Sequence, residues 1–126
     1  MMKYDVLIVG AGPAGIFAAL QLAKAKDISV CIVDKGPDID QRVRKAELLT
    51  GWGGAGAFSD GKLTLSPEVG GQLGSVMPER EVRRLLKYVD QIWVDYGGAD
   101  RVYGTDADGV AAIAHQAQLA GMKLVH

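Results

Sequence analysis

Residues 4–20 read YDVLIVGAGPAGIFAAL, and this stretch decides how the first half of the chain folds. Val6–Val9 is an unbroken apolar run, which is typical of a parallel strand covered on both faces. A glycine turn follows directly. The alanine-rich pattern after it predicts a helix from about Pro13 to Ala25. The order of strand, tight turn and helix predicts the beginning of a βαβ unit.

The turn has the spacing G-x-G-x-x-G, and each glycine has its own expected task. Gly10 permits a tight reversal, Gly12 lets the backbone approach a ligand, and Gly15 lets the helix pack closely on the strand. Proline suits the first helical position, where its missing N–H is not needed. The helix begins with free N–H groups at the positive end of its dipole, so the turn is expected to bind a diphosphate. The residues predicted for this site are Gly10, Gly12, Pro13, Ala14 and Gly15.

Size and composition exclude several classes of protein. The chain has 126 residues, enough for one ordinary domain but few for a two-domain enzyme. A net charge of −1 provides no global attraction to nucleic acid or to an anionic membrane, so neither is an expected partner. The single cysteine, Cys31, excludes an intrachain disulfide and favours a reducing compartment, so we expect a cytoplasmic protein. No stretch approaches the ~20 apolar residues of a membrane span.

A second strand is predicted at Ile28–Val33, and it ends at an acidic residue, Asp34. The crossover should be right-handed, so both strands run parallel and their carboxyl ends share one edge. Asp34 follows Gly15 by 34 − 15 = 19 residues, close to the ~20 expected for a carboxylate that binds an adenosine ribose. We therefore predict an ADP-containing cofactor, with Asp34 and the neighbouring Lys35 at its ribose. The alternative is a similar core with a merely tight turn and a solvated Asp34.

The segment from residue 36 to residue 50 is polar and has a partly helical pattern. Arg42, Arg44 and Lys45 in this segment are candidates to reach the phosphates of a cofactor. The alternative is that these cations lie on a solvated helix face. Arg42 is the one retained as a predicted cofactor-binding residue.

A second glycine-rich stretch, GWGGAGAFSDGK, covers residues 51–62. Glycine loses the most entropy on ordering, so a packed helix or strand is not expected here. We predict a second ligand-contacting loop. The alternative, a flexible linker, is disfavoured by the apolar Trp52 and Phe58. The predicted contacts are Gly53, Gly54, Ala55, Ser59, Asp60 and Lys62.

The second half of the chain is expected to be mainly helical. A short strand at Lys62–Ser66 and a loop to Met77 precede a strongly amphipathic helix, which begins at Pro78–Glu79 and is ended by Gly97. A last helix is capped by Thr105 and runs to about Ala120, and residues 122–126 are expected to begin another strand. The two histidines, His115 and His126, have no partner in the pattern, so no metal site is predicted.

Two motifs give the chain a family resemblance. Residues 5–15, DVLIVGAGPAG, resemble the FAD-binding start of flavoproteins with two dinucleotide-binding domains. Residues 53–63, GGAGAFSDGKL, and residues 100–104, DRVYG, are similar to a largely uncharacterised group of FAD-dependent dehydrogenases in the NAD(P)/FAD-dependent oxidoreductase superfamily. The resemblance implies an α/β, Rossmann-like fold with a parallel sheet and flanking helices. It also implies that the three glycines hold the FAD diphosphate, that Asp34 holds the ribose, and that residues 53–62 follow the diphosphate towards the flavin.

The chain departs from that group in two respects. The segment between the acidic strand end and the second glycine loop is short and lacks cysteine. Chains of that group are also expected to continue further, with a substrate domain. We therefore expect residues 1–126 to be the N-terminal FAD-binding domain of a larger flavoprotein, or a truncated form of one.

The predicted function is an FAD-dependent oxidoreductase, with NAD(P)H as a candidate electron donor. The small-molecule substrate, the catalytic residues and the oligomeric state are not indicated by the sequence. Asp60 and Lys62 are the nearest acid and base candidates, although we expect them to contact the cofactor. Two alternatives stay open: a non-catalytic module that binds FAD or NAD, and a non-redox enzyme on the same fold, which Gly70-Gly71-Gln72-Leu73 faintly resembles.

Overall fold

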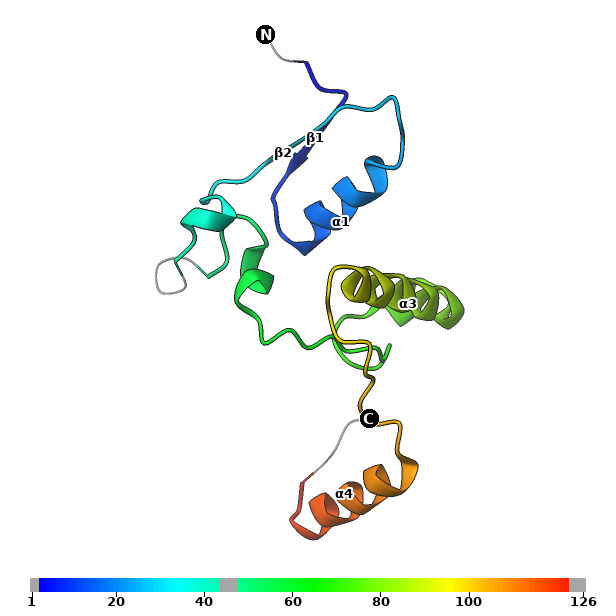
Figure 1. Cartoon of the computed structure of the whole chain (residues 1–126). Coiled ribbons are helices and arrows are strands. Elements are labelled where there is room, and N and C mark those ends of the chain that lie inside the picture. The colour runs from blue at the N-terminus through cyan, green and yellow to red at the C-terminus, as the bar shows by residue number, and fades with distance from the viewer. Residues whose placement is uncertain (1–2, 44–47, 123–126) are drawn as a thin grey trace. The chain divides into compact units, whose positions relative to one another are not determined.

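The computed structural model describes residues 3–43 and 48–122 (Figure 1). The chain divides into two compact units, Met1–Lys62 and Leu63–His126, and each is described here by itself. The predicted strand start at residues 123–126 lies outside the described residues, and so do Arg44 and Lys45.

The first unit is organised by one βαβ element. Strand β1 (Val6–Val9) leads through the glycine turn into helix α1 (Pro13–Leu22), and the chain returns as strand β2 (Val30–Val33). The two strands pair in parallel, with Val6 opposite Val30 and Val9 opposite Val33. Helix α1 packs against both strands, as Figure 1 shows. The predicted order of elements and the parallel pairing are confirmed, and the unit is a mixed helix-and-strand fold compatible with a Rossmann-like FAD-binding fold.

Strand β1 is covered on one of its faces and exposed on the other among the described residues. Along β1, Val6 and Ile8 are half-buried, whereas Leu7 and Val9 are 60% and 80% exposed. Ile8 is on the helix side, because its Cγ2 atom would lie 3.2 Å from a Cβ atom added to Gly15. The expectation of a strand covered on both faces is therefore wrong for this structure. An unbroken apolar run shows that both faces are apolar, but it does not identify what covers each of them.

A polar pair fixes the start of the sheet. The Asp5 carboxylate accepts hydrogen bonds from the Ser29 backbone N–H at 2.8 Å and from the Ser29 hydroxyl at 2.5 Å. The hydrogen bond from the Ser29 side chain is the main reason why the pKa of Asp5 is lowered. These contacts join the residues just before β1 and β2, so they favour the observed register over a slipped one.

Two short 3₁₀ helices follow β2 within the first unit. The first is η1 (Ile39–Gln41), whose N-terminus is capped by the Asp38 side chain. The second is η2 (Gly54–Phe58), which lies inside the second glycine stretch. The expectation that this stretch has no helical structure is thus wrong over five residues. Gly53 and Gly54 have φ values of 81° and 55°, which only glycine adopts readily, so the glycines permit the turn into η2.

The second unit contains three helices among its described residues: α2 (Leu73–Val76), α3 (Glu79–Asp95) and α4 (Ala107–Leu119). Helix α2 contacts α3. The apolar positions of α3 share one stripe, of which Val82 is buried, and the charged positions face outward. Arg83 and Arg84 form ion pairs with Glu79 and Glu81 on that outer side. The predicted amphipathic helix is confirmed, and it ends before Gly97, whose φ is 94°.

Three expectations about the second half need correction. Residues 62–66 form no strand, and helix α2 occurs within the predicted loop at Pro67–Met77. The cap of α4 is Asp106 and not Thr105, because the Asp106 carboxylate accepts a hydrogen bond from the Gly109 N–H. Alternation over five residues is weak support for a strand when no partner strand is available. Among the described residues, no helix combines the length and the apolar character needed to cross a membrane.

Candidate functional site

The three glycines of the turn differ in what surrounds them. Gly10 has a φ of 105°, and its N–H donates to the Val33 carbonyl at 2.7 Å, which makes the reversal at the end of β1 tight. A Cβ atom added to Gly15 would overlap the carbonyl oxygen of Gly10, so only glycine lets α1 approach β1 this closely. A Cβ atom added to Gly12 would meet nothing within 4 Å. The space beside Gly12 is therefore open for a ligand to approach the backbone.

The N-terminus of α1 is the natural place for an anion. Gly12 is the N-cap residue, Pro13 begins the helix, and the first turn has neither a side-chain cap nor an acidic residue. By contrast, Asp106 caps α4. The first N–H groups of a helix have no partner within the helix, and its dipole is positive there. An uncapped start without a carboxylate leaves both features available to a diphosphate.

Asp34 joins three backbone segments beside the turn. Its Oδ2 atom accepts from the Ala11 N–H at 2.8 Å, and its Oδ1 atom accepts from Gly36 at 2.9 Å and Gly51 at 2.7 Å. These three hydrogen bonds, that from Ala11 foremost, lower the pKa of Asp34, and the charge of Lys35 lowers it slightly further. Asp34 therefore connects the glycine turn to the second glycine loop. Its contact with a ribose stays a prediction, and a carboxylate has acceptor capacity beyond three hydrogen bonds.

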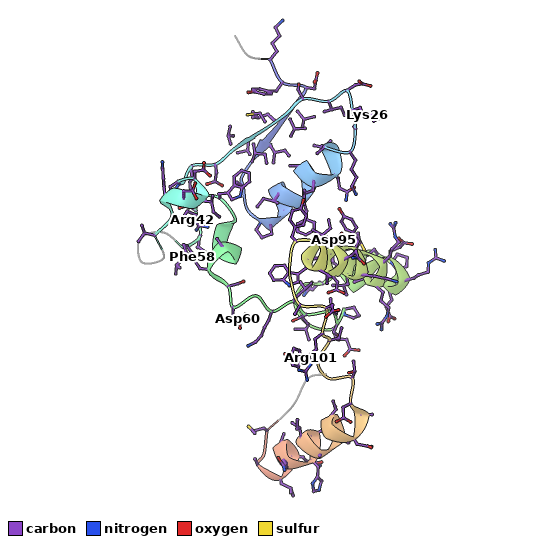
Figure 2. The ribbon with its side chains drawn as sticks, viewed as in Figure 1. Lys26, Arg42, Phe58, Asp60, Asp95 and Arg101 are labelled. Carbon is purple, nitrogen blue, oxygen red and sulfur yellow. The ribbon has the colours of Figure 1, made fainter. Side chains whose placement is uncertain are left out.

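Arg42 is neither on a solvated helix face nor in a helix. Its Nη1 atom donates to the carbonyls of Trp52 at 2.7 Å and Gly54 at 2.6 Å, and its Nη2 atom donates to the carbonyl of Leu48 at 3.0 Å. The guanidinium also lies 4.7 Å from the centre of the Phe58 ring. Figure 2 shows these two side chains next to each other. The guanidinium thus binds the second glycine loop, and its predicted contact with cofactor phosphates is untested.

The second glycine loop packs directly on the glycine turn. The Gly53 N–H donates to the Ala11 carbonyl at 2.8 Å. Gly54 is buried, and a Cβ atom added to it would lie 3.3 Å from the Cα atom of Gly12. A Cβ atom on Gly56 would lie 3.6 Å from the ring of Pro13. Two stretches that are about 40 residues apart in the sequence therefore form one surface around the start of α1.

The remaining predicted residues are exposed. Lys62 forms an ion pair with Asp60 at 2.9 Å, and Figure 2 shows Asp60 on the extended segment that follows η2. The Lys62 hydrogen bond lowers the pKa of Asp60, and the same contact raises the pKa of Lys62. The Ser59 hydroxyl accepts from the Gly61 N–H at 3.2 Å. None of the contacts described for these residues reaches the glycine turn, and Lys35 and Ala55 are also exposed.

Sequence reasoning missed Ala11, Gly36 and Gly51, which supply the N–H groups that Asp34 binds. Of these three, Gly36 could have been found from the sequence. The position requires glycine, because a Cβ atom there would lie 2.6 Å from the carbonyl carbon of Thr50. A glycine two residues after the acidic strand end is the pattern that would have shown it. Among residues 3–43 and 48–122, no cluster of acidic, histidine or cysteine side chains is suited to hold a metal ion.

The charge state of Asp34 yields a pH prediction. Its pKa is lowered in the folded protein, so its contribution to stability is complete above the ordinary value of 3.8 and is lost as the pH falls through the lowered value. We expect Asp34→Asn to lower the thermal midpoint at pH 7, and the difference from wild type to shrink towards pH 3. Thermal unfolding of both proteins between pH 7 and pH 3 measures this. A difference that stays constant over that range would contradict the role of the charge.

A glycine turn, an uncapped helix start and an acid at the end of the second strand together define a βαβ unit suited to binding a nucleotide diphosphate. The comparison with protein families is more specific. Residues 5–125 match the model of the FAD dependent oxidoreductase family, so the chain belongs to that family. The resemblance drawn from the sequence motifs is confirmed, and the family supports FAD as the cofactor.

Several curated proteins are similar to parts of this chain. An uncharacterised protein of Clostridium beijerinckii is 44% identical over 76 residues, which is 50% of this chain and 14% of that protein. The mitochondrial electron transfer flavoprotein-ubiquinone oxidoreductase of Arabidopsis thaliana is 56% identical over 43 residues, 30% of this chain and 7% of that protein. A digeranylgeranylglycerophospholipid reductase of Methanosarcina mazei is 49% identical over 45 residues, 36% of this chain and 11% of that protein.

The chain thus spans only a small share, between 7% and 14%, of the length of these relatives. No solved structure matches the chain.

Proposed function

We propose that this chain forms the FAD-binding part of a flavin-dependent dehydrogenase and holds the FAD diphosphate at the N-terminus of α1. The observation that carries the proposal is the open space beside Gly12, at a helix start that has neither a cap nor an acidic residue. Family membership supports FAD as the cofactor that would supply this diphosphate. The Rossmann-like fold of the whole domain, with helices on both faces of a larger sheet, is part of this proposal.

In this proposal, different residues of the first unit contact different parts of the cofactor. Gly10 and Gly15 shape the turn, while the backbone at Gly12, Pro13 and Ala14 lies against the diphosphate. Asp34 binds the adenosine ribose with the acceptor capacity left on its carboxylate, and Lys35 lies beside it. The loop from Gly53 to Ala55 covers the diphosphate. Ser59, Asp60 and Lys62 extend from the end of η2 towards the flavin.

The relatives support a cofactor role for the matched segments. Their names state different reactions, one with electron transfer flavoprotein and ubiquinone and the other with a digeranylgeranylglycerophospholipid. Because these reactions differ, the short segments that the proteins share are better explained by binding of a common cofactor than by binding of a common substrate. Bound FAD supplies hydride and electron transfer, and the chain supplies binding and orientation. NAD(P)H as the electron donor and a cytoplasmic location stay predictions.

A second candidate is a module that binds the nucleotide without turnover. This candidate is favoured by the role of Asp34 beside the glycine turn. The Asp34 carboxylate accepts hydrogen bonds from backbone N–H groups, which is a structural role and not that of a catalytic acid or base. Anaerobic addition of NADH or NADPH to the FAD-loaded protein separates the two candidates. Bleaching of the visible flavin band supports the dehydrogenase, and an unchanged spectrum with both donors favours the module.

Binding itself is tested by titration of the purified protein with FAD, followed by quenching of flavin fluorescence. We expect saturable binding that ADP weakens by competition. Competition is expected because ADP carries the diphosphate and ribose that the α1 site would bind. A protein that does not bind FAD, or one whose FAD binding is indifferent to ADP, would refute the proposed site.

A further inference from the structure

Arg42 contacts the second glycine loop in a way that the sequence did not indicate. Among the described residues, its guanidinium donates hydrogen bonds to the carbonyls of Leu48, Trp52 and Gly54. These carbonyls belong to a stretch in which Gly51, Gly53 and Gly54 all have positive φ. Such a glycine-rich segment loses much entropy when it is ordered, so it needs specific contacts to keep one conformation.

The direction of these hydrogen bonds determines which N–H groups of the loop face the glycine turn. In a planar trans peptide the C=O and the following N–H point in opposite directions. Since the Trp52 carbonyl points to Arg42, the Gly53 N–H points away from Arg42, and it donates to the Ala11 carbonyl at 2.8 Å. Arg42 thereby turns the loop so that it joins the glycine turn. Asp34 completes the attachment from the other side, because it accepts N–H groups from both Ala11 and Gly51.

The geometry is specific for arginine. A guanidinium is planar, always charged, and presents several N–H groups in a fixed arrangement that can reach more than one carbonyl. The Phe58 ring, 4.7 Å from the guanidinium, favours one orientation of its plane. A lysine ammonium keeps the positive charge but has neither the planar geometry nor the same stacking on the ring.

We propose that Arg42 is a positioning residue for the cofactor site, which acts by holding the second glycine loop against the glycine turn and not by contacting the cofactor phosphates. It holds two carbonyls of the loop and the carbonyl of Leu48, which lies just before the loop. Through them it sets the contact of Gly53 with Ala11 and of Gly54 with Gly12. The loop that would cover the FAD diphosphate is therefore shaped before the cofactor binds. The effect on FAD affinity rests on the proposed function, whereas the order of the loop does not.

The first test is made on the protein without FAD. Hydrogen exchange of the Gly53 N–H reports whether the loop is joined to Ala11. We expect Arg42→Lys to speed this exchange at least about tenfold, which is the loss expected when hydrogen bonds to a charged group are broken. Far-ultraviolet circular dichroism and exchange in β1 and β2 should remain as in wild type. Unchanged exchange at Gly53 in a folded Arg42→Lys protein would overturn the proposal, whatever the protein does with FAD.

The second test separates positioning from direct phosphate contact. We expect Arg42→Lys and Arg42→Gln to lose FAD affinity to a similar extent, about tenfold to a hundredfold, because both lose the planar set of donors. The ratio of variant to wild-type affinity should not change with salt. If Arg42 contacted the phosphates, Lys would retain most of the affinity, and the loss with Gln would shrink at high salt. That pattern would overturn the proposal.

A matched control is available on α3. Arg80 is 91% exposed and forms one ion pair with Glu81 at 3.5 Å. Arg80→Lys and Arg80→Gln make the same chemical changes outside the first unit, so we expect neither exchange at Gly53 nor FAD affinity to change. A wild-type protein that fails to bind FAD would refute the proposed function alone, since the exchange experiment still decides the role of Arg42.

Discussion

Replacement of Gly12 by valine is expected to abolish FAD binding and to leave the protein folded. Gly12 has an ordinary φ of −76°, and a Cβ atom added there meets nothing within 4 Å, so the folded chain accepts a side chain at this position. The same open space is where the diphosphate is proposed to approach the N-terminus of α1. A valine would fill it. We expect a loss of at least about 100-fold in affinity, or about 2.7 kcal/mol, measured by fluorescence titration with FAD.

The second unit offers a matched control for this change. Gly71 also has open space around an added Cβ atom and no positive φ. Gly71→Val makes the same substitution at a comparable glycine, so FAD affinity should stay as in wild type. The thermal midpoints of both variants should lie close to that of wild type. A Gly12→Val protein that retains its affinity would mean that the cofactor binds elsewhere on the chain.

Gly15→Ala is expected to destabilise the first unit, although only Pro13 and Ala14 separate it from Gly12. An added Cβ atom would overlap the carbonyl oxygen of Gly10 and would press on its carbonyl carbon, and backbone atoms cannot move aside cheaply. Helix α1 would have to shift away from β1. Overpacking of this kind typically costs about 1–3 kcal/mol, so the thermal midpoint should fall by on the order of 10 °C.

The sign of this effect distinguishes close packing from helix propensity. Alanine in place of glycine within a helix is ordinarily favourable by about 1 kcal/mol. If Gly15 lay on a free face of α1, the substitution would therefore raise the thermal midpoint. Gly12→Ala serves as the control for a methyl group at the same turn, and it should leave the midpoint nearly unchanged. A Gly15→Ala protein as stable as wild type would refute the close contact of α1 with β1.

The βαβ element could be predicted because its signals are local. The apolar run Val6–Val9, the glycine turn and the apolar run that ends at Asp34 each specify their own conformation over a few residues. The crossover helix then returns the chain to the same end of the sheet, so the strands are parallel, which the pairing of Val6 with Val30 confirms. The separate tasks of Gly10 and Gly15 also follow from the motif, and the structure agrees with them through the φ of Gly10 and the overlap at Gly15.

The contacts of the second glycine loop could not be predicted in the same way. Arg42 lies in a segment whose pattern indicated a helix face, and among the described residues of that segment the chain forms the short helix η1, which ends at Gln41. Its partners are main-chain carbonyls, which every residue carries, so no residue type in the sequence marks them. The same is true of the N–H groups that Asp34 binds.

The sequence by itself determined the strand, turn, helix and acidic strand end, and with them the class of ligand, because these depend on backbone preferences that neighbouring residues set. Only the tertiary structure decided how the loop from Gly51 to Phe58 meets the glycine turn. The physical reason is that this meeting depends on hydrogen bonds between one charged side chain and the main chain of a distant segment. Asp34, whose contact with a ribose stays a prediction, joins the glycine turn to the second glycine loop, and Arg42 donates hydrogen bonds to that loop.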